Sequence, residues 1–162
     1  MRISVVTFPG SNCDHDAYRV CQSRSHQTKL IWHKDTNLEN PDLVILPGGF
    51  SYGDYLRCGA LARFSPIVKE VIAFARKGGL LLGICNGFQI LTECGLLPGT
   101  LLMNASLHFI CQHQFVRVET AANPFTTGIG KGRILDLPVA HKEGNFYIES
   151  DGLKQLQDND QI

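Results

Sequence analysis

The segment from Gly79 to Gly95 constrains the fold of this chain more than any other part of the sequence. In it a short apolar run, Leu80 to Ile84, meets a helix-like run, Phe88 to Cys94, with no polar linker between them. The backbone must therefore turn sharply at Cys85. Glycines stand two residues before and two residues after this cysteine. The result is the Gly-x-Cys-x-Gly pattern of a nucleophile elbow, with sulfur in place of the serine oxygen.

Two glycines, Gly83 and Gly87, make this turn possible. We expect strand and helix to pass so close together that a Cβ atom at either position would collide with the opposing element. Such a turn lifts the thiol of Cys85 above the sheet and places it at a helix N-terminus. There the unpaired amides and the helix dipole favour the thiolate. The alternative interpretation is a buried cysteine in an ordinary strand-helix junction.

Apolar strands alternate with helices along the first part of the chain. The predicted strands are Ile3 to Phe8, Thr28 to Trp32, Leu43 to Leu46 and Leu80 to Ile84, and the predicted helices are Asp14 to Ser25, one that starts at Pro66 after a Ser65 cap, and Phe88 to Cys94. Strands that are apolar throughout are typical of a mostly parallel sheet with helices on both faces. Further on, strands are predicted at Leu107 to Cys111, Phe115 to Glu119 and Ile134 to Leu137, and a short helix at Leu153 to Gln157.

Length and charge exclude several classes of protein. A chain of 162 residues is long enough for one core, so we predict a single domain over residues 1–162. The formal net charge is zero and the basic residues are scattered, which argues against nucleic acid and anionic membranes as partners. No signal peptide or membrane-spanning segment is visible, and the six cysteines form no Cys-x-x-Cys pair. We therefore expect a cytoplasmic protein with reduced thiols.

Two special loops follow neighbouring strands. Pro47, Gly48 and Gly49 come directly after one apolar strand, and Cys85 comes directly after the next. In a parallel sheet, ligands bind outside the carboxyl ends of the strands. Paired glycines there leave backbone N–H groups approachable, as an oxyanion hole requires. The alternative interpretation is a plain Pro-Gly-Gly turn.

Two other segments resemble metal-binding or ATP-binding motifs, but their spacing does not fit either function. His108, Cys111 and His113 would lie on opposite faces of a strand, so they cannot converge on a metal ion. The Gly128 to Arg133 segment resembles a phosphate loop, but Lys131 is followed by glycine and the spacing is wrong. We expect no metal and no cofactor in this chain.

Four blocks of sequence carry a more specific resemblance: Pro9 to Asp14, Pro47 to Ala60, Gly83 to Leu91 and Pro138 to His141. Together, and in this order, they closely resemble the glutaminase subunit of phosphoribosylformylglycinamidine synthase, a class I glutamine amidotransferase of purine biosynthesis. The resemblance implies an α/β fold of the flavodoxin-like type, a three-layer sandwich with helices on both faces of the sheet. The Pro-Gly-Gly-Phe-Ser-Tyr-Gly-Asp-Tyr block is its most specific part.

The resemblance also implies roles for individual residues. Cys85 would attack the side-chain amide of glutamine and form a γ-glutamyl thioester. The backbone amides of Gly49 and Asn86 would hold the oxyanion. The residues that would contact the bound glutamine are Phe50, Ser51 and Gln89.

Partners follow from the same resemblance. The released ammonia would pass through a channel to a large synthetase subunit, which converts formylglycinamide ribonucleotide to the amidine. That subunit would bind ATP and Mg²⁺, in agreement with the absence of an ATP motif here. A small third subunit would complete the synthase.

One departure from the family pattern is expected to matter. Members of this kind carry a His-Pro-Glu motif in a later segment, and the motif supplies the catalytic base. This sequence contains no His-Pro-Glu, so we expect a C-terminally shortened chain with a poorly active site. His141 and Glu143 form a His-x-Glu whose side chains would share a face on a strand. They are either a substitute dyad or polar residues near the site or the subunit interface.

Two other functions stay open at this point. The chain could be a non-catalytic remnant that still docks on the synthetase as a structural or regulatory module. It could instead be a stand-alone cysteine hydrolase on a related fold, which the Phe50 to Ala60 block argues against.

Overall fold

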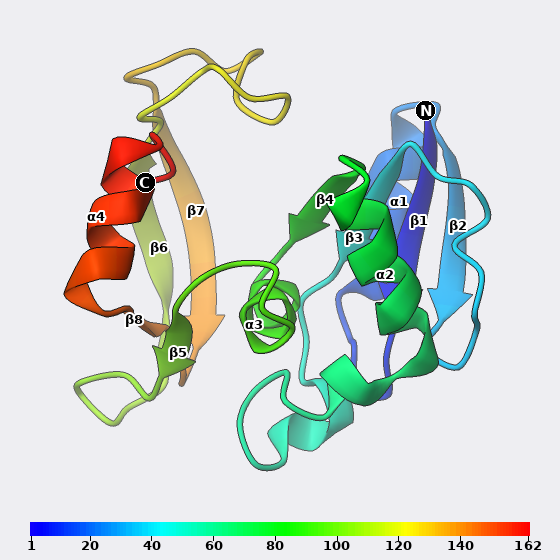
Figure 1. The fold of residues 1–162 in the computed structure, drawn as a ribbon, viewed down its shortest axis with the longest axis horizontal. Coiled ribbons are helices and arrows are strands. Elements are labelled where there is room, and N and C mark those ends of the chain that lie inside the picture. The colour runs from blue at the N-terminus through cyan, green and yellow to red at the C-terminus, as the bar shows by residue number, and fades with distance from the viewer. The chain divides into compact units, whose positions relative to one another are not determined.

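The computed structural model describes residues 1–162 and contains two compact units, Met1–Pro98 and Gly99–Ile162 (Figure 1). Each unit has its own hydrogen-bonded strands and is described separately below. The single domain predicted over residues 1–162 stays a prediction. None of the helices is both long enough and apolar enough to cross a lipid bilayer.

A four-stranded parallel sheet forms the centre of the first unit, in the order β2-β1-β3-β4. Its strands are β1 (Arg2–Thr7), β2 (Gln27–Trp32), β3 (Leu43–Leu46) and β4 (Leu80–Gly83). The four predicted strands are confirmed, with ends that differ by at most one residue. The apolar runs become strands because β1 and β3 lie inside the sheet and bury side chains on both faces.

Helices cover both faces of this sheet (Figure 1). They are α1 (Asp14–Ser23), α2 (Pro66–Arg76) and α3 (Asn86–Glu93), with short 3₁₀ turns η1 (Ser51–Asp54) and η2 (Ala62–Phe64). Ile3, Val5 and Ile45 point to the face that α1 covers. Val6, Val44, Leu46 and their neighbours pack against α2 and α3 on the other face. The first unit is therefore the three-layer α/β sandwich that the sequence predicts.

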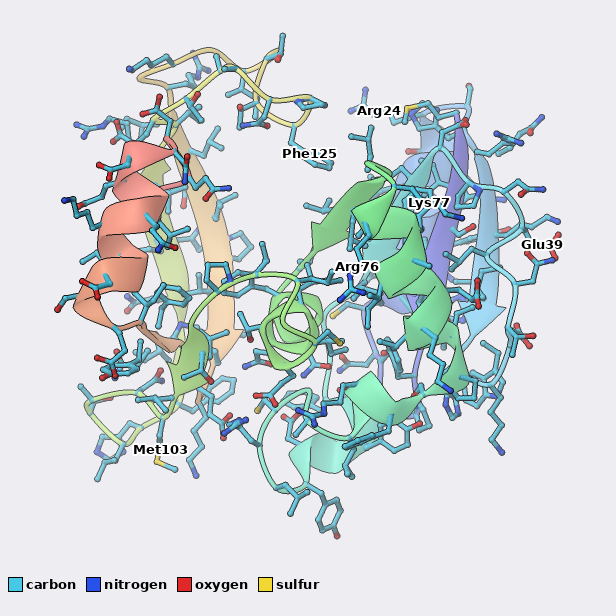
Figure 2. All side chains as sticks on the ribbon, viewed as in Figure 1. Arg24, Glu39, Arg76, Lys77, Met103 and Phe125 are labelled. Atoms are coloured by element: carbon cyan, nitrogen blue, oxygen red, sulfur yellow. The ribbon has the colours of Figure 1, made fainter.

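The ends of α2 show one correction. Pro66 is the first residue of the helix, as predicted, but the hydroxyl of Ser65 makes no capping hydrogen bond. Its Oγ lies 2.9 Å from the Tyr52 hydroxyl instead. At the other end, Arg76 and Lys77 place positive charge where the helix dipole favours it (Figure 2).

The second unit is antiparallel. Strand β6 (Ile110–Arg117) pairs with β7 (Ile134–His141), and β5 (Thr100–Leu102) pairs with β8 (Asn145–Tyr147). Helix α4 (Ser150–Asp158) follows, in place of the shorter helix predicted there.

The strand predictions were least accurate in the second unit. The two strands predicted at Leu107 to Cys111 and Phe115 to Glu119 are wrong, since a single strand pairs with β7 over eight residues. Leu107 stands outside it with a φ of 60°, which a strand residue does not adopt. Strands β5 and β8 are three residues each, too short to show an alternating pattern.

Candidate active site

Cys85 stands at a tight turn between β4 and α3. Its backbone has φ 51° and ψ −109°, a region that residues with side chains rarely adopt and that costs about 1–3 kcal/mol. Two hydrogen bonds hold the turn: Ile84 N–H donates to the Leu46 carbonyl at 3.0 Å, and Gly87 N–H donates to the Ile84 carbonyl at 2.9 Å. The side chain of Cys85 is exposed. The turn therefore holds the thiol open to solvent at the start of α3, and the alternative of a buried cysteine is wrong.

The two flanking glycines are required for steric reasons, as predicted. A Cβ atom at Gly87 would overlap the carbonyl oxygen of Leu46 at the end of β3. A Cβ atom at Gly83 would lie 2.9 Å from the backbone of Gly87. Both positions meet backbone atoms, which cannot rotate away, and a Cβ at Gly83 would also lie 2.6 Å from Leu91 Cδ1. The elbow consequently exists only with glycine at these two positions.

The loop after β3 lies beside the elbow. A Cβ atom on Gly48 would stand 3.5 Å from the Cβ of Cys85, so the two loops meet at this point. Gly49 has a φ of 137°, and a Cβ there would lie 2.7 Å from the backbone nitrogen of Asn12. The N–H of Phe50 donates to the carbonyl of Gly10 at 2.9 Å. Backbone contacts thus join the loops that follow β1 and β3, next to Cys85.

A buried amide connects this loop to the elbow helix. The side chain of Asn86 is almost fully buried, and its Oδ1 accepts a hydrogen bond from the Ser51 N–H at 3.1 Å. Its Nδ2 lies 2.9 Å from Gln89 Oε1 and 3.3 Å from Asp54 Oδ1. Asn86, the residue after Cys85, therefore contacts Ser51, Asp54 and Gln89 through its side chain.

A second cysteine, Cys13, lies beside Gly48 and close to Cys85. Its Sγ and the Cβ of Cys85 are both within 3.6 Å of the point where a Gly48 Cβ would stand. Partial burial and the nearby carboxylates of Asp16 and Asp14 raise the pKa of the Cys13 thiol. At neutral pH this neighbour stays protonated, which makes it a poor nucleophile.

Comparison with known proteins decides the family. The model of the CobB/CobQ-like glutamine amidotransferase domain family matches residues 1–162. The PurQ subunit of phosphoribosylformylglycinamidine synthase from Salinibacter ruber is 54% identical over 99% of this chain and 69% of its own length. The same subunit from a Synechococcus strain is 55% identical over 100% of this chain and 72% of its own length.

This chain belongs to the PurQ family.

Solved structures agree with that assignment. A chain in the structure of PurLQS from Thermotoga maritima matches 93% of this chain and 70% of its own length, at 45% identity and a TM-score of 0.88. A glutamine amidotransferase from Thermotoga maritima matches 93% of this chain and 64% of the other at 19% identity and a TM-score of 0.61. The second likeness concerns the fold alone.

Two of the three residues predicted to contact glutamine, Ser51 and Gln89, form hydrogen bonds with the Asn86 side chain. Phe50 is half exposed, whereas Ser51 and Gln89 are buried. The hydroxyl of Ser51 is buried and has no hydrogen-bond partner. Their role in binding glutamine, like the oxyanion role of the Gly49 and Asn86 amides, stays a prediction.

The predicted geometry of His141 and Glu143 is wrong. Strand β7 ends at His141, so the two side chains do not share a strand face. His141 Nδ1 lies 3.0 Å from Oδ1 of the buried Asn104, which also accepts the Gly144 N–H at 3.0 Å. This contact orients the imidazole through a residue that the sequence did not single out.

Two contacts that hold the segment after β3 were not predicted from the sequence. Tyr52 has a φ of 55°, and its hydroxyl lies 2.7 Å from His33 Nδ1 behind the loop. Burial and the positive charge of Lys34 lower the pKa of His33. Arg57 makes a two-pronged contact of 2.6 and 2.9 Å with the carboxylate of Glu93. These partners are far apart in sequence, and no motif connects them.

Proposed function

We propose that this chain is the glutaminase subunit of phosphoribosylformylglycinamidine synthase and that Cys85 is its nucleophile. The observation that supports the role of Cys85 is its exposed thiol on a strained turn, with the Gly48 and Gly49 loop directly beside it. Strain of this kind persists where the surrounding structure fixes it, which is common at active sites. The relatives described above are named as the PurQ subunit of the synthase.

The chemistry is acyl transfer. The thiolate of Cys85 attacks the side-chain amide carbon of glutamine, and the carbonyl oxygen takes up negative charge. Backbone amides of Gly49 and Asn86 stabilise that charge as the tetrahedral intermediate forms. The C–N bond breaks, the nitrogen takes a proton and leaves as ammonia, and a γ-glutamyl thioester remains. Water then hydrolyses the thioester to glutamate and restores the thiol.

The proton for the departing nitrogen must come from a general acid. Asn104 orients His141, and Glu143 follows it two residues later. We propose that His141 and Glu143 act at the interface with the synthetase subunit.

The ammonia is used by a partner. We propose that a large synthetase subunit receives it and binds ATP and Mg²⁺, and that a small third subunit completes the assembly. The composition of the PurLQS structure from Thermotoga maritima supports this. The glutaminase chain itself needs no cofactor, because the thiol and the backbone amides supply the chemistry. We place the complex in the cytoplasm.

Selective alkylation tests this function. A chloroketone analogue of glutamine should modify Cys85 at least about tenfold faster than any of the other five cysteines, because only Cys85 stands on the elbow beside the proposed oxyanion hole. Peptide mass spectrometry after brief exposure of the native chain measures the label at each site. Cys13 is the internal control, since it is exposed and adjacent to Cys85. Equal labelling of all six thiols would contradict the proposal and favour a docking module.

A further inference from the structure

The side-chain amide of Asn86 has a complete set of hydrogen-bond partners in a buried position. Oδ1 accepts from the Ser51 N–H, and Nδ2 faces Gln89 Oε1 and Asp54 Oδ1. Only 1% of Asn86 is exposed to solvent. An unpaired amide in such a place costs about 1–3 kcal/mol, so this set of partners is strongly favoured.

The two ends of the amide cannot be exchanged. The backbone N–H of Ser51 can only donate, so it requires an oxygen opposite it. Oδ1 of Asp54 accepts a hydrogen bond from Asn86 Nδ2 at 3.3 Å, so it requires an N–H opposite it. The short primary amide of asparagine offers both on two separate atoms, an accepting oxygen and a donating NH2 group. Asp54 thus sets the orientation of Asn86, and Asn86 in turn faces the oxygen of the Gln89 amide.

These contacts bridge the two backbone segments that carry the predicted oxyanion donors. Asn86 directly follows Cys85 and begins α3. Ser51 stands two residues after Gly49, in the loop after β3. Peptide units are stiff, so a bond from Asn86 to the Ser51 N–H limits how far the Gly49 amide can move from the Asn86 amide.

We propose that the Asn86 side chain, oriented by Asp54, is a positioning group that sets the separation of the two oxyanion-hole amides. The inference rests on the proposed function and deepens it: the backbone of Asn86 binds the oxyanion, and its side chain places the second donor. Asp54 acts through Asn86 and touches no reacting atom.

An isosteric exchange tests the proposal. Asn86→Asp keeps the acceptor for Ser51 but removes the donor for Asp54, and it sets two carboxylates against each other. The double variant Asp54→Asn, Asn86→Asp exchanges donor and acceptor and restores one hydrogen bond between the two positions, while the Gln89 amide can turn to donate. Asn40→Asp makes the same chemical change at an exposed loop residue and is the matched control.

Two reagents report on the oxyanion hole and on the thiol separately. The glutamine chloroketone is attacked at its carbonyl carbon, so its reaction passes through an oxyanion that needs the backbone amides. With iodoacetamide, the thiolate attacks the CH2 carbon directly and iodide leaves, so no oxyanion forms. The measured quantity is the ratio of the two rate constants for modification of Cys85 in the full chain.

We expect Asn86→Asp to lower this ratio at least about tenfold, toward the ~10²–10³-fold loss typical of a missing oxyanion donor. The double variant should recover most of the loss, and Asn40→Asp should match the wild type. A merely structural role would lower both rate constants together and leave the ratio unchanged.

Distinct results overturn the inference and the proposed function. If the wild type reacts selectively at Cys85 but Asn86→Asp keeps the same ratio, or the double variant stays as low as the single one, the positioning role is wrong. If the wild-type chain shows no preference for the chloroketone at Cys85, the proposed glutaminase itself fails. If Asn86→Asp does not fold, the same ratio of rate constants is measured in Asp54→Ala instead. The inference expects a severalfold lower ratio in that variant, and an unchanged ratio overturns it.

Discussion

Single atoms decide whether the elbow can form. Gly87 lies where the first turn of α3 passes the end of β3, and a Cβ atom there would overlap the Leu46 carbonyl oxygen. That oxygen already accepts the hydrogen bond from Ile84 N–H. A methyl group at position 87 would therefore push on the same backbone that holds the cysteine turn.

We expect Gly87→Ala to lower the free energy of unfolding by about 1–3 kcal/mol or more, the usual cost of overpacking a site that cannot relax. Gly128→Ala is the matched control, because nothing lies within 4 Å of its added Cβ. Urea denaturation of both variants and the wild type measures the effect. Equal stabilities would show that α3 can shift away from β3 without loss.

Between elements, a partly buried ion pair connects Arg57, in the segment after β3, to Glu93 at the end of α3. The side chain of Glu93 is only 5% exposed, and Arg57 from the loop contacts both its oxygens. A carboxylate so covered loses hydration, and the paired guanidinium with its two hydrogen bonds offsets that loss. The exposed pair of Arg2 and Asp42 has the same chemistry without the burial.

Replacing Arg57 tests this fastening. We expect Arg57→Met to destabilise the chain by about 1–3 kcal/mol, because it leaves the covered Glu93 carboxylate without its charged partner. Arg2→Met should cost no more than about 1 kcal/mol, as exposed pairs do. Chemical denaturation of the two variants gives the comparison. A loss for Arg57→Met no larger than that for Arg2→Met would contradict the prediction.

For the molecule as a whole, the two units differ in how much their strands are covered. Strands β1 and β3 are buried on both faces. Most residues of β6 and β7 are exposed, among them the apolar Phe115, Ile134 and Leu137. Covered strands open only with larger parts of the fold, whereas exposed ones open locally.

Hydrogen exchange of the full chain should show this difference. We expect amides in β1 and β3 to exchange at least about tenfold more slowly than those in β6 and β7. Mass spectrometry of peptic peptides after timed exposure to deuterium measures the rates. Equal protection of the two pairs of strands would contradict the expectation.

The same contrast explains what sequence alone could predict. The Leu43–Leu46 run is a strand whatever surrounds it, since four apolar residues before Pro-Gly-Gly leave few choices. The Cys85 elbow could also be predicted, because glycines on both sides of the cysteine indicate that strand and helix pass too close for a Cβ atom. Strand β6 was split in two because its exposed residues follow no buried alternation. The Asn86 contacts were invisible, as Ser51 and Asp54 lie more than thirty positions away and carry no pattern.

The strained backbone of Cys85 also has an evolutionary consequence. Only glycine adopts a φ of 51° with a ψ of −109° at little cost, so a cysteine at position 85 makes this turn less stable than a glycine would. A descendant that no longer needed to release ammonia would gain by exchanging this cysteine for glycine. Glycine at position 85 in an otherwise similar sequence would therefore mark a lineage in which the chemistry has been lost and the scaffold kept.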